Sequence, residues 1–94
     1  MLNIGLIGYN QRVRDVIIPA ISRTNHIALT HFYHEGEAEG LPQGARIYAN
    51  RENLFLDETI DIFLVCTSFD QRFDDCKDAL NSGKPVLVDG AITS

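Results

Sequence analysis

The chain has 94 residues, of which 45% are hydrophobic and 22% charged, which is typical of one small globular domain and excludes a disordered tail or a disulfide scaffold. Eight basic against thirteen acidic residues give a net charge of −5, which argues against a nucleic-acid-binding surface. No apolar run approaches the roughly 20 residues of a membrane span, and no basic segment of a secretory signal opens the chain. We therefore expect a single cytoplasmic domain over residues 1–94, with neither nucleic acid nor membrane as partner.

The first two predicted elements are a strand and a helix. Residues 2–7 form a continuous apolar run, which indicates a strand buried on both faces. Asn10 is a candidate N-cap for the helix that follows. Pro19 lies inside this helix and is expected to kink it or loosen one turn, and Thr24-Asn25 ends it. The apolar face of this helix consists of Val13, Val16, Ile17, Ala20 and Ile21.

The middle of the chain predicts short elements separated by a loop. Residues 27–33 indicate a second strand, and residues 34–44, rich in glycine and glutamate, indicate a loop. Residues 46–49 predict a short third strand. Asn50 can cap a short helix that ends at Leu56, and residues 61–66 indicate a fourth buried strand.

A third helix and a fifth strand complete the predicted elements. Ser68 and Gln71 have the S-x-x-Q spacing of a capping box, which marks the start of the helix. Gly83 and Pro85 predict its end, and residues 85–88 a fifth strand.

The faces of the third helix are predicted from its side chains. We expect Phe73, Cys76 and Leu80 to form the apolar face. Electrostatics at the helix start and solubility account for the carboxylates of this helix without assigning them any chemistry. These carboxylates belong to Asp70, Asp74, Asp75 and Asp78.

The order of the elements predicts the fold class. Strands separated by helical connections form parallel sheets, so we expect a doubly wound, Rossmann-type α/β domain with strand order 3-2-1-4-5. Ligands of such sheets bind at the carboxyl ends of the strands. That rule brings residues 8–12, 33–35, 67–70 and 89–91 around one crevice.

Several segments resemble one family. The opening Ile4-Gly5-Leu6-Ile7-Gly8 and the runs YANRENLF, IDIFLVCTS and ALNSGKPVLVDGA resemble the N-terminal domain of the Gfo/Idh/MocA oxidoreductases. The resemblance implies a domain that binds NAD or NADP. It also implies a second, larger domain that supplies the substrate site and often the dimer interface. Residues 1–94 stop just past the family's E-K-P motif, so we expect the first domain to be incomplete and the substrate domain to be absent.

The glycine fingerprint departs from the pattern G-x-G-x-x-G. Gly8 stands at the first glycine, but Asn10 and Val13 stand at the second and third. The Asn10 side chain is expected to intrude on a pyrophosphate. The cofactor site is therefore degenerate relative to the family.

Cofactor contacts are expected from three segments of the predicted crevice. The acid that binds the adenosine ribose corresponds to Tyr33, or to Glu35 if the register slips by two residues. Arg12 and Arg14 either face phosphates or are merely solvated. The candidate binding residues are Gly8, Tyr9, Asn10, Gln11, Arg12, Tyr33, His34, Thr67 and Ser68.

No catalytic residue is predicted. Asp89-Gly90-Ala91 replaces the family's E-K-P, and Gly90 cannot do the work of the lysine. Two hypotheses follow: the cofactor-binding part of an oxidoreductase that is not catalytic by itself, or a binding or assembly module that has lost the cofactor. A different anionic ligand, bound through Arg12, Arg72 and helix N-termini, is a further alternative. An open sheet edge also favours pairing with another copy or with further sequence.

We expect no metal and no reactive thiol. His31 and His34 point to opposite faces of their strand and cannot easily share an ion. Cys66 and Cys76 lack a zinc or redox spacing, and both are expected to be reduced and packed. Arg72, four residues before Cys76, leaves a lowered thiol pKa as an alternative.

Overall fold

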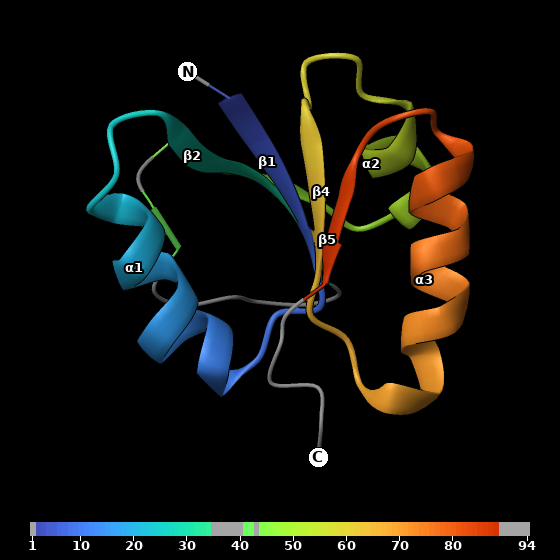
Figure 1. The fold of residues 1–94 in the computed structure, drawn as a ribbon, viewed down its shortest axis with the longest axis horizontal. Coiled ribbons are helices and arrows are strands. Elements are labelled where there is room, and N and C mark those ends of the chain that lie inside the picture. Colours follow the sequence, from blue (N-terminus) through green and yellow to red (C-terminus); the bar gives the residue numbers. More distant parts are fainter. Residues whose placement is uncertain (1, 35–40, 43, 89–94) are drawn as a thin grey trace.

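The computed structural model describes residues 2–34, 41–42 and 44–88. Five strands form one parallel sheet in the order β3-β2-β1-β4-β5, which confirms the predicted topology (Figure 1). The strands are β1 (Leu2–Ile7), β2 (Ile27–Tyr33), β3 (Arg46–Tyr48), β4 (Ile62–Val65) and β5 (Val86–Val88). The first two have the predicted bounds, and the other three are shorter than expected by one or two residues.

Helices cover both faces of the sheet. A π-helical turn, η1 (Val13–Ile17), leads into α1 (Ile18–Ser22), which lies on one side of the sheet in Figure 1. On the other side lie α2 (Arg51–Leu56) and α3 (Phe69–Asn81). This is the doubly wound arrangement that the alternation of strands and helices predicts.

Pro19 loosens the helical turn before it, as predicted. The N–H of Ile18 bonds to the carbonyl of Val13, five residues back, and Pro19 falls at the start of α1. Proline has no N–H to bond to the carbonyl of Asp15, so one α-helical bond cannot form here. The wider π turn accommodates that missing bond.

The helix boundaries follow the predicted caps, with one difference. Asn50 accepts a hydrogen bond from the Glu52 N–H at 2.8 Å, which caps α2 as expected. Ser68 occupies the N-cap position of α3, but its side chain makes no capping bond, so the predicted capping box is wrong. The Ser68 carbonyl instead accepts from the N–H groups of Gln71 and Arg72 at 3.1 and 3.0 Å. At the other end, Gly83 has the positive φ of +86° that favours glycine there.

The core divides into two clusters. One includes Leu6, Val13 and Phe32, and η1 and α1 pack against it through Ile17, Ile18 and Ile21. The other, toward α2 and α3, consists of Ile7, Leu54, Ile60, Phe63, Val65 and Ala79. Burial on both faces explains the continuous apolar runs in β1 and β4.

The predicted apolar face of α3 is wrong at two of its three positions. Phe73 and Leu80 are 76% and 60% exposed, whereas Asp75 is 6% exposed and Ala79 fully buried. Asp75 pairs with Arg51 of α2 and lies on the side of α3 that faces inward, as do Cys76 and Ala79. The prediction that Asp75 is a solvated charge is therefore also wrong.

Both cysteines are packed, as predicted. Cys66 is buried and Cys76 half-buried, and the two are not joined in a disulfide. Burial, together with the nearby Asp75 carboxylate, raises the pKa of the Cys76 thiol. The alternative of a lowered thiol pKa is thus wrong.

Among the described residues, no helix is long and apolar enough to cross a membrane.

Candidate functional site

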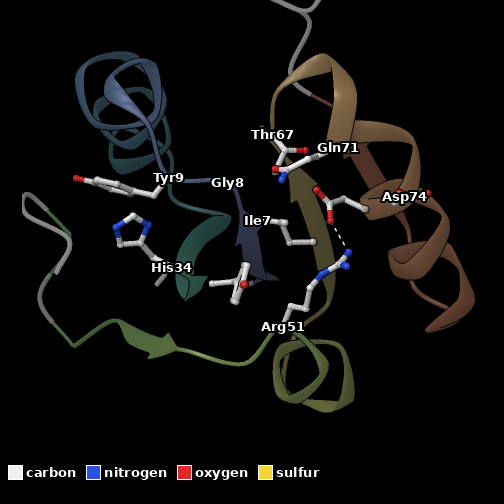
Figure 2. Close-up of a pocket in the computed structure, with 10 residues that line it drawn as sticks. Ile7, Gly8, Tyr9, His34, Arg51, Thr67, Gln71 and Asp74 are labelled. Carbon is white, nitrogen blue, oxygen red and sulfur yellow. Dashed lines mark hydrogen bonds and ion pairs between the residues drawn. The ribbon is translucent and has the colours of Figure 1, made fainter. Parts of the chain in front are cut away.

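A cleft of about 440 Å³ opens at the carboxyl ends of β1, β2 and β4 (Figure 2). The carboxyl ends of the strands are where this fold class is predicted to bind a ligand. Among the predicted binding residues, those that line it are Gly8, Tyr9, Tyr33, His34 and Thr67. The other lining residues are Ile7, Arg51, Gln71, Asp74 and Asp75.

Four predicted binding residues do not line this cleft: Asn10, Gln11, Arg12 and Ser68. All four are solvent-exposed and lie beside the cleft, at the starts of the first helical segment and of α3. A ligand that extends beyond the cleft toward the first helix would approach Asn10, Gln11 and Arg12.

Gly8 makes the tight turn between β1 and the first helix. Its φ is +95°, in the left-handed region that favours glycine. A Cβ at this position would lie 2.8 Å from the carbonyl carbon of Cys66 and from the backbone nitrogen of Thr67. The turn thus packs directly against the end of β4, and both requirements select glycine.

Asn10 joins the same turn to β4. Its Oδ1 accepts a hydrogen bond from the Val13 N–H at 2.9 Å, and its Nδ2 donates to the Cys66 carbonyl at 3.0 Å. Asn10 therefore caps the first helix, as predicted. Its backbone has no positive φ. Its carboxamide occupies an N–H group at the helix start, where dinucleotide-binding folds hold a pyrophosphate.

One wall of the cleft is aromatic. The Tyr9 and His34 rings lie 5.4 Å apart at 59°, and they adjoin each other in Figure 2. Tyr33 ends β2, where a ribose-binding acid is usual in this fold. Glu35, the alternative acid, lies outside the described residues.

The opposite wall is polar and was missed by sequence reasoning. It comprises Gln71, Asp74 and Asp75 of α3, with Arg51 at the start of α2 (Figure 2). Arg51 Nη2 binds Asp75 and also binds Asp78 Oδ2 at 2.9 Å. The position of these acids in the first turns of a helix that follows β4 was the signal that could have found them, because that helix starts at the ligand edge of the sheet.

Thr67 lines the cleft and carries a buried hydroxyl. Its Oγ1 is buried and makes no hydrogen bond within the described part of the chain. Buried hydroxyls are nearly always hydrogen-bonded, and those that are not call for an explanation. Thr67 lines the cleft, but its Oγ1 atom is itself buried, so a ligand could bond to it only after the side chain turns toward the cleft.

A second polar cluster surrounds Asp57, in the segment between α2 and β4. The Asp57 carboxylate accepts bonds from the Tyr48 hydroxyl and from the Thr59 N–H at 2.8 Å, and it lies 3.3 Å from His31 Nε2. Lys84 Nζ donates to the Asp57 carbonyl at 2.6 Å. The bonds from Thr59 and Tyr48 hold the pKa of Asp57 well below its usual range, while burial lowers the pKa of His31.

His31 and His34 separate as the strand geometry predicts. His31 is 4% exposed and belongs to the Asp57 cluster, whereas His34 lines the cleft. Within the residues that the structure describes, no group of three or more His, Cys, Asp or Glu side chains is placed to hold a metal ion.

The comparisons with known proteins agree with this architecture. Residues 2–92 match the model of the Gfo/Idh/MocA family, described as an oxidoreductase family with an NAD-binding Rossmann fold. The chain belongs to this family. Among curated protein sequences, no match is found.

Solved structures share the Gfo/Idh/MocA fold of this chain. An oxidoreductase from Bacillus cereus superposes with a TM-score of 0.85 at 22% identity, over 94% of this chain and 27% of its own. D-galactose-1-dehydrogenase from Rhizobium etli gives 0.75 at 24% identity, over 92% of this chain and 27% of its own. The family member described here thus spans under a third of the length of these structures.

Proposed function

We propose that this chain binds NAD or NADP as the cofactor-binding part of an oxidoreductase. The observation that carries the proposal is the position of the cleft. It opens where β1 has β2 on one side and β4 on the other, which is the point where the strand order reverses. Doubly wound sheets bind dinucleotides at this point. Membership of an NAD-binding family supports the same conclusion.

The cleft suits the adenosine half of a dinucleotide. The paired rings of Tyr9 and His34 offer an aromatic surface for a planar base. The buried Thr67 hydroxyl, without a hydrogen-bond partner among the described residues, can bond to a ligand once its side chain turns toward the cleft. These residues would bind and orient the adenosine.

The turn after β1 would hold the pyrophosphate less well. The tight turn at Gly8 is preserved, and Arg12 lies at the helix start. Asn10, however, takes up the Val13 N–H that a phosphate oxygen could otherwise use. We therefore expect an affinity in the micromolar to low-millimolar range.

We propose further that residues 1–94 form one Rossmann-type unit that does not turn over by itself. Bound nicotinamide supplies the hydride-transfer chemistry, and this chain contributes binding and orientation. Gly90 stands at the position of the family's lysine and lies outside the described residues, as do Asp89 and Ala91. A glycine offers no proton and no charge, so a substrate-binding part must supply the acid or base.

Calorimetric titration with NADH and then NADPH tests the proposal. We expect binding with at least one of them, weakened about fivefold or more by His34→Ala, because stacking on a base is worth on the order of 1 kcal/mol. His26→Ala is the matched control, since His26 is exposed and does not line the cleft. No heat from a folded sample, or equal loss in both variants, would refute the cofactor role.

A second candidate is an assembly module that keeps the fold without the cofactor. What favours it is the exposed apolar surface of α3 and β5: Phe73, Leu80, Leu87 and Val88 are between 41% and 76% exposed. Large exposed apolar patches commonly mark interaction sites. Sedimentation velocity would support this candidate if the chain self-associates and binds no dinucleotide, and a monomer that binds NADH would refute it.

A further inference from the structure

Acidic side chains dominate the charges that line the cleft. Asp74 and Asp75 line the cleft together with a single cation, Arg51, among the described lining residues. Arg51 is already committed to Asp75, whose side chain is 8% exposed, and to Asp78 at 2.9 Å. Asp74 makes no ion pair within the described part of the chain, so its negative charge is not compensated locally.

Among the described residues that line the cleft, no cation is therefore available for a 2′-phosphate. Folds of this class bind NADP by placing an arginine near the end of the second strand, where the adenosine ribose lies. Here that strand ends in Tyr33 and is followed by His34. A phosphate that approached Arg51 would also meet Asp74 and would compete with Asp75 for the guanidinium.

We propose that the cleft selects NAD against its 2′-phosphorylated form NADP, and that Asp74 is the residue that sets this preference. The inference rests on the proposed function and adds the class of dinucleotide. Asp74 acts from α3, whereas the usual discriminating acid of this fold is at the end of the second strand. Asp74 disfavours NADP through its negative charge, because a phosphate monoester brings about two negative charges into the cleft.

The expected size of the effect follows from Coulomb's law. A carboxylate about 8 Å from a dianionic phosphate in water-like surroundings disfavours it by about threefold to fivefold. The preference should shrink as salt screens the charges.

Titration of the chain with NAD⁺ and NADP⁺ at low and high salt tests the inference. We expect wild type to bind NAD⁺ at least about threefold more tightly than NADP⁺ at low salt. Asp74→Asn should narrow that ratio by about threefold to fivefold. Asp70→Asn is the matched control, because Asp70 is an exposed carboxylate in the first turn of the same helix and does not line the cleft.

The outcomes separate the inference from the proposed function. Equal affinity of wild type for the two dinucleotides, or the same ratio in Asp74→Asn as in wild type, would overturn the role of Asp74 while leaving dinucleotide binding intact. A ratio that Asp70→Asn changes as much as Asp74→Asn would assign the effect to general charge and also overturn it. Binding of neither dinucleotide would overturn the proposed function, and the inference with it.

Discussion

The Asp57 cluster and the cleft both gather polar side chains against the same sheet, yet they differ in how those side chains are partnered. In the Asp57 cluster, the carboxylate bonds to Tyr48 and Thr59 and adjoins His31, while Lys84 bonds to the carbonyl. In the cleft, the Thr67 hydroxyl has no partner among the described residues. Asp74 makes no ion pair there.

This difference distinguishes polar residues that stabilise the fold from polar residues that can bind a ligand. Polar groups that satisfy one another in a packed interior stabilise the fold and leave nothing for a ligand. Polar groups that face a cavity with bonds unmade can bond to something else. We therefore propose that the Asp57 cluster stabilises the fold and that the cleft binds a ligand.

The largest predicted effect is on the Asp57 cluster. Asp57→Ala should lower the free energy of unfolding by about 2 kcal/mol, because the half-buried Tyr48 hydroxyl and the Thr59 N–H lose their acceptor. Urea denaturation followed by circular dichroism measures it. Glu58→Ala, an exposed neighbour, is the control and should change stability by less than about 0.5 kcal/mol. A loss under about 1 kcal/mol for Asp57→Ala would show that the cluster is not structural.

The next effect concerns Asn10, which should affect both the stability of the fold and the affinity for the dinucleotide. Asn10→Gly should cost about 1 kcal/mol of stability, because the bonds to Val13 and Cys66 are lost. It should also raise affinity for NADH several-fold, because the Val13 N–H becomes available to a phosphate. Asn10→Ala loses the same bonds but keeps a Cβ near the turn. If calorimetry finds no gain with glycine, the turn is not the pyrophosphate site.

A pH effect should arise from His31. Its pKa is lowered in the folded state, chiefly by burial, which outweighs the attraction of Asp57, while Arg46 and Lys84 lower it further. The unfolded chain therefore binds more protons as pH falls below about 6.5, and stability should decrease there. His31→Gln should remove this slope in urea titrations, and His26→Gln should keep it. A wild-type stability that is flat from pH 7 to 5 would contradict the burial of a neutral imidazole.

Asp57 should cause a second change of folding stability with pH, in a more acidic range. Its folded pKa is lowered, so the stability it contributes is present above the unfolded value near 3.9 and is lost as the pH falls below it. Asp57→Asn should remove this loss. An acid transition identical to that of wild type would assign the lost stability to other carboxylates.

The smallest effect is expected on the outer side of α3. Phe73→Ser should change stability by less than about 0.5 kcal/mol, because the ring is 76% exposed. Thermal denaturation measures this. A loss above about 1 kcal/mol would mean that the ring packs against the fold. If wild type self-associates in sedimentation, Phe73→Ser should weaken that association, and an unchanged association would place the contact elsewhere.

The sequence was sufficient for the fold because its signals are local and periodic. Apolar runs, Gly83 and the caps at Asn10 and Asn50 marked most boundaries, and the alternation of elements determined a parallel sheet. The burial of Asp75 on the inward side of α3 could not be predicted, because its partner Arg51 lies 24 positions away and no local pattern indicates the pair. For the same reason Asp75 was taken for a solvated charge.

The site was predictable where it depends on the backbone and not where it depends on long side chains. Gly8, Tyr33 and Thr67 follow from the ends of strands, so topology placed them at the cleft. Arg51 reaches the cleft from the start of α2, and no local pattern indicates its direction. The Asp57 cluster likewise joins residues of β2, β3 and the segment before β5.

The most direct test is a two-dimensional ¹⁵N–¹H NMR titration of the chain with NADH. We predict that amide shifts change around Gly8–Arg12, His34 and Thr67–Gln71, while those of His31, Asp57 and Thr59 stay fixed. Shifts centred on the Asp57 cluster, or no change at millimolar NADH, would contradict the assignment of the cleft as the dinucleotide site.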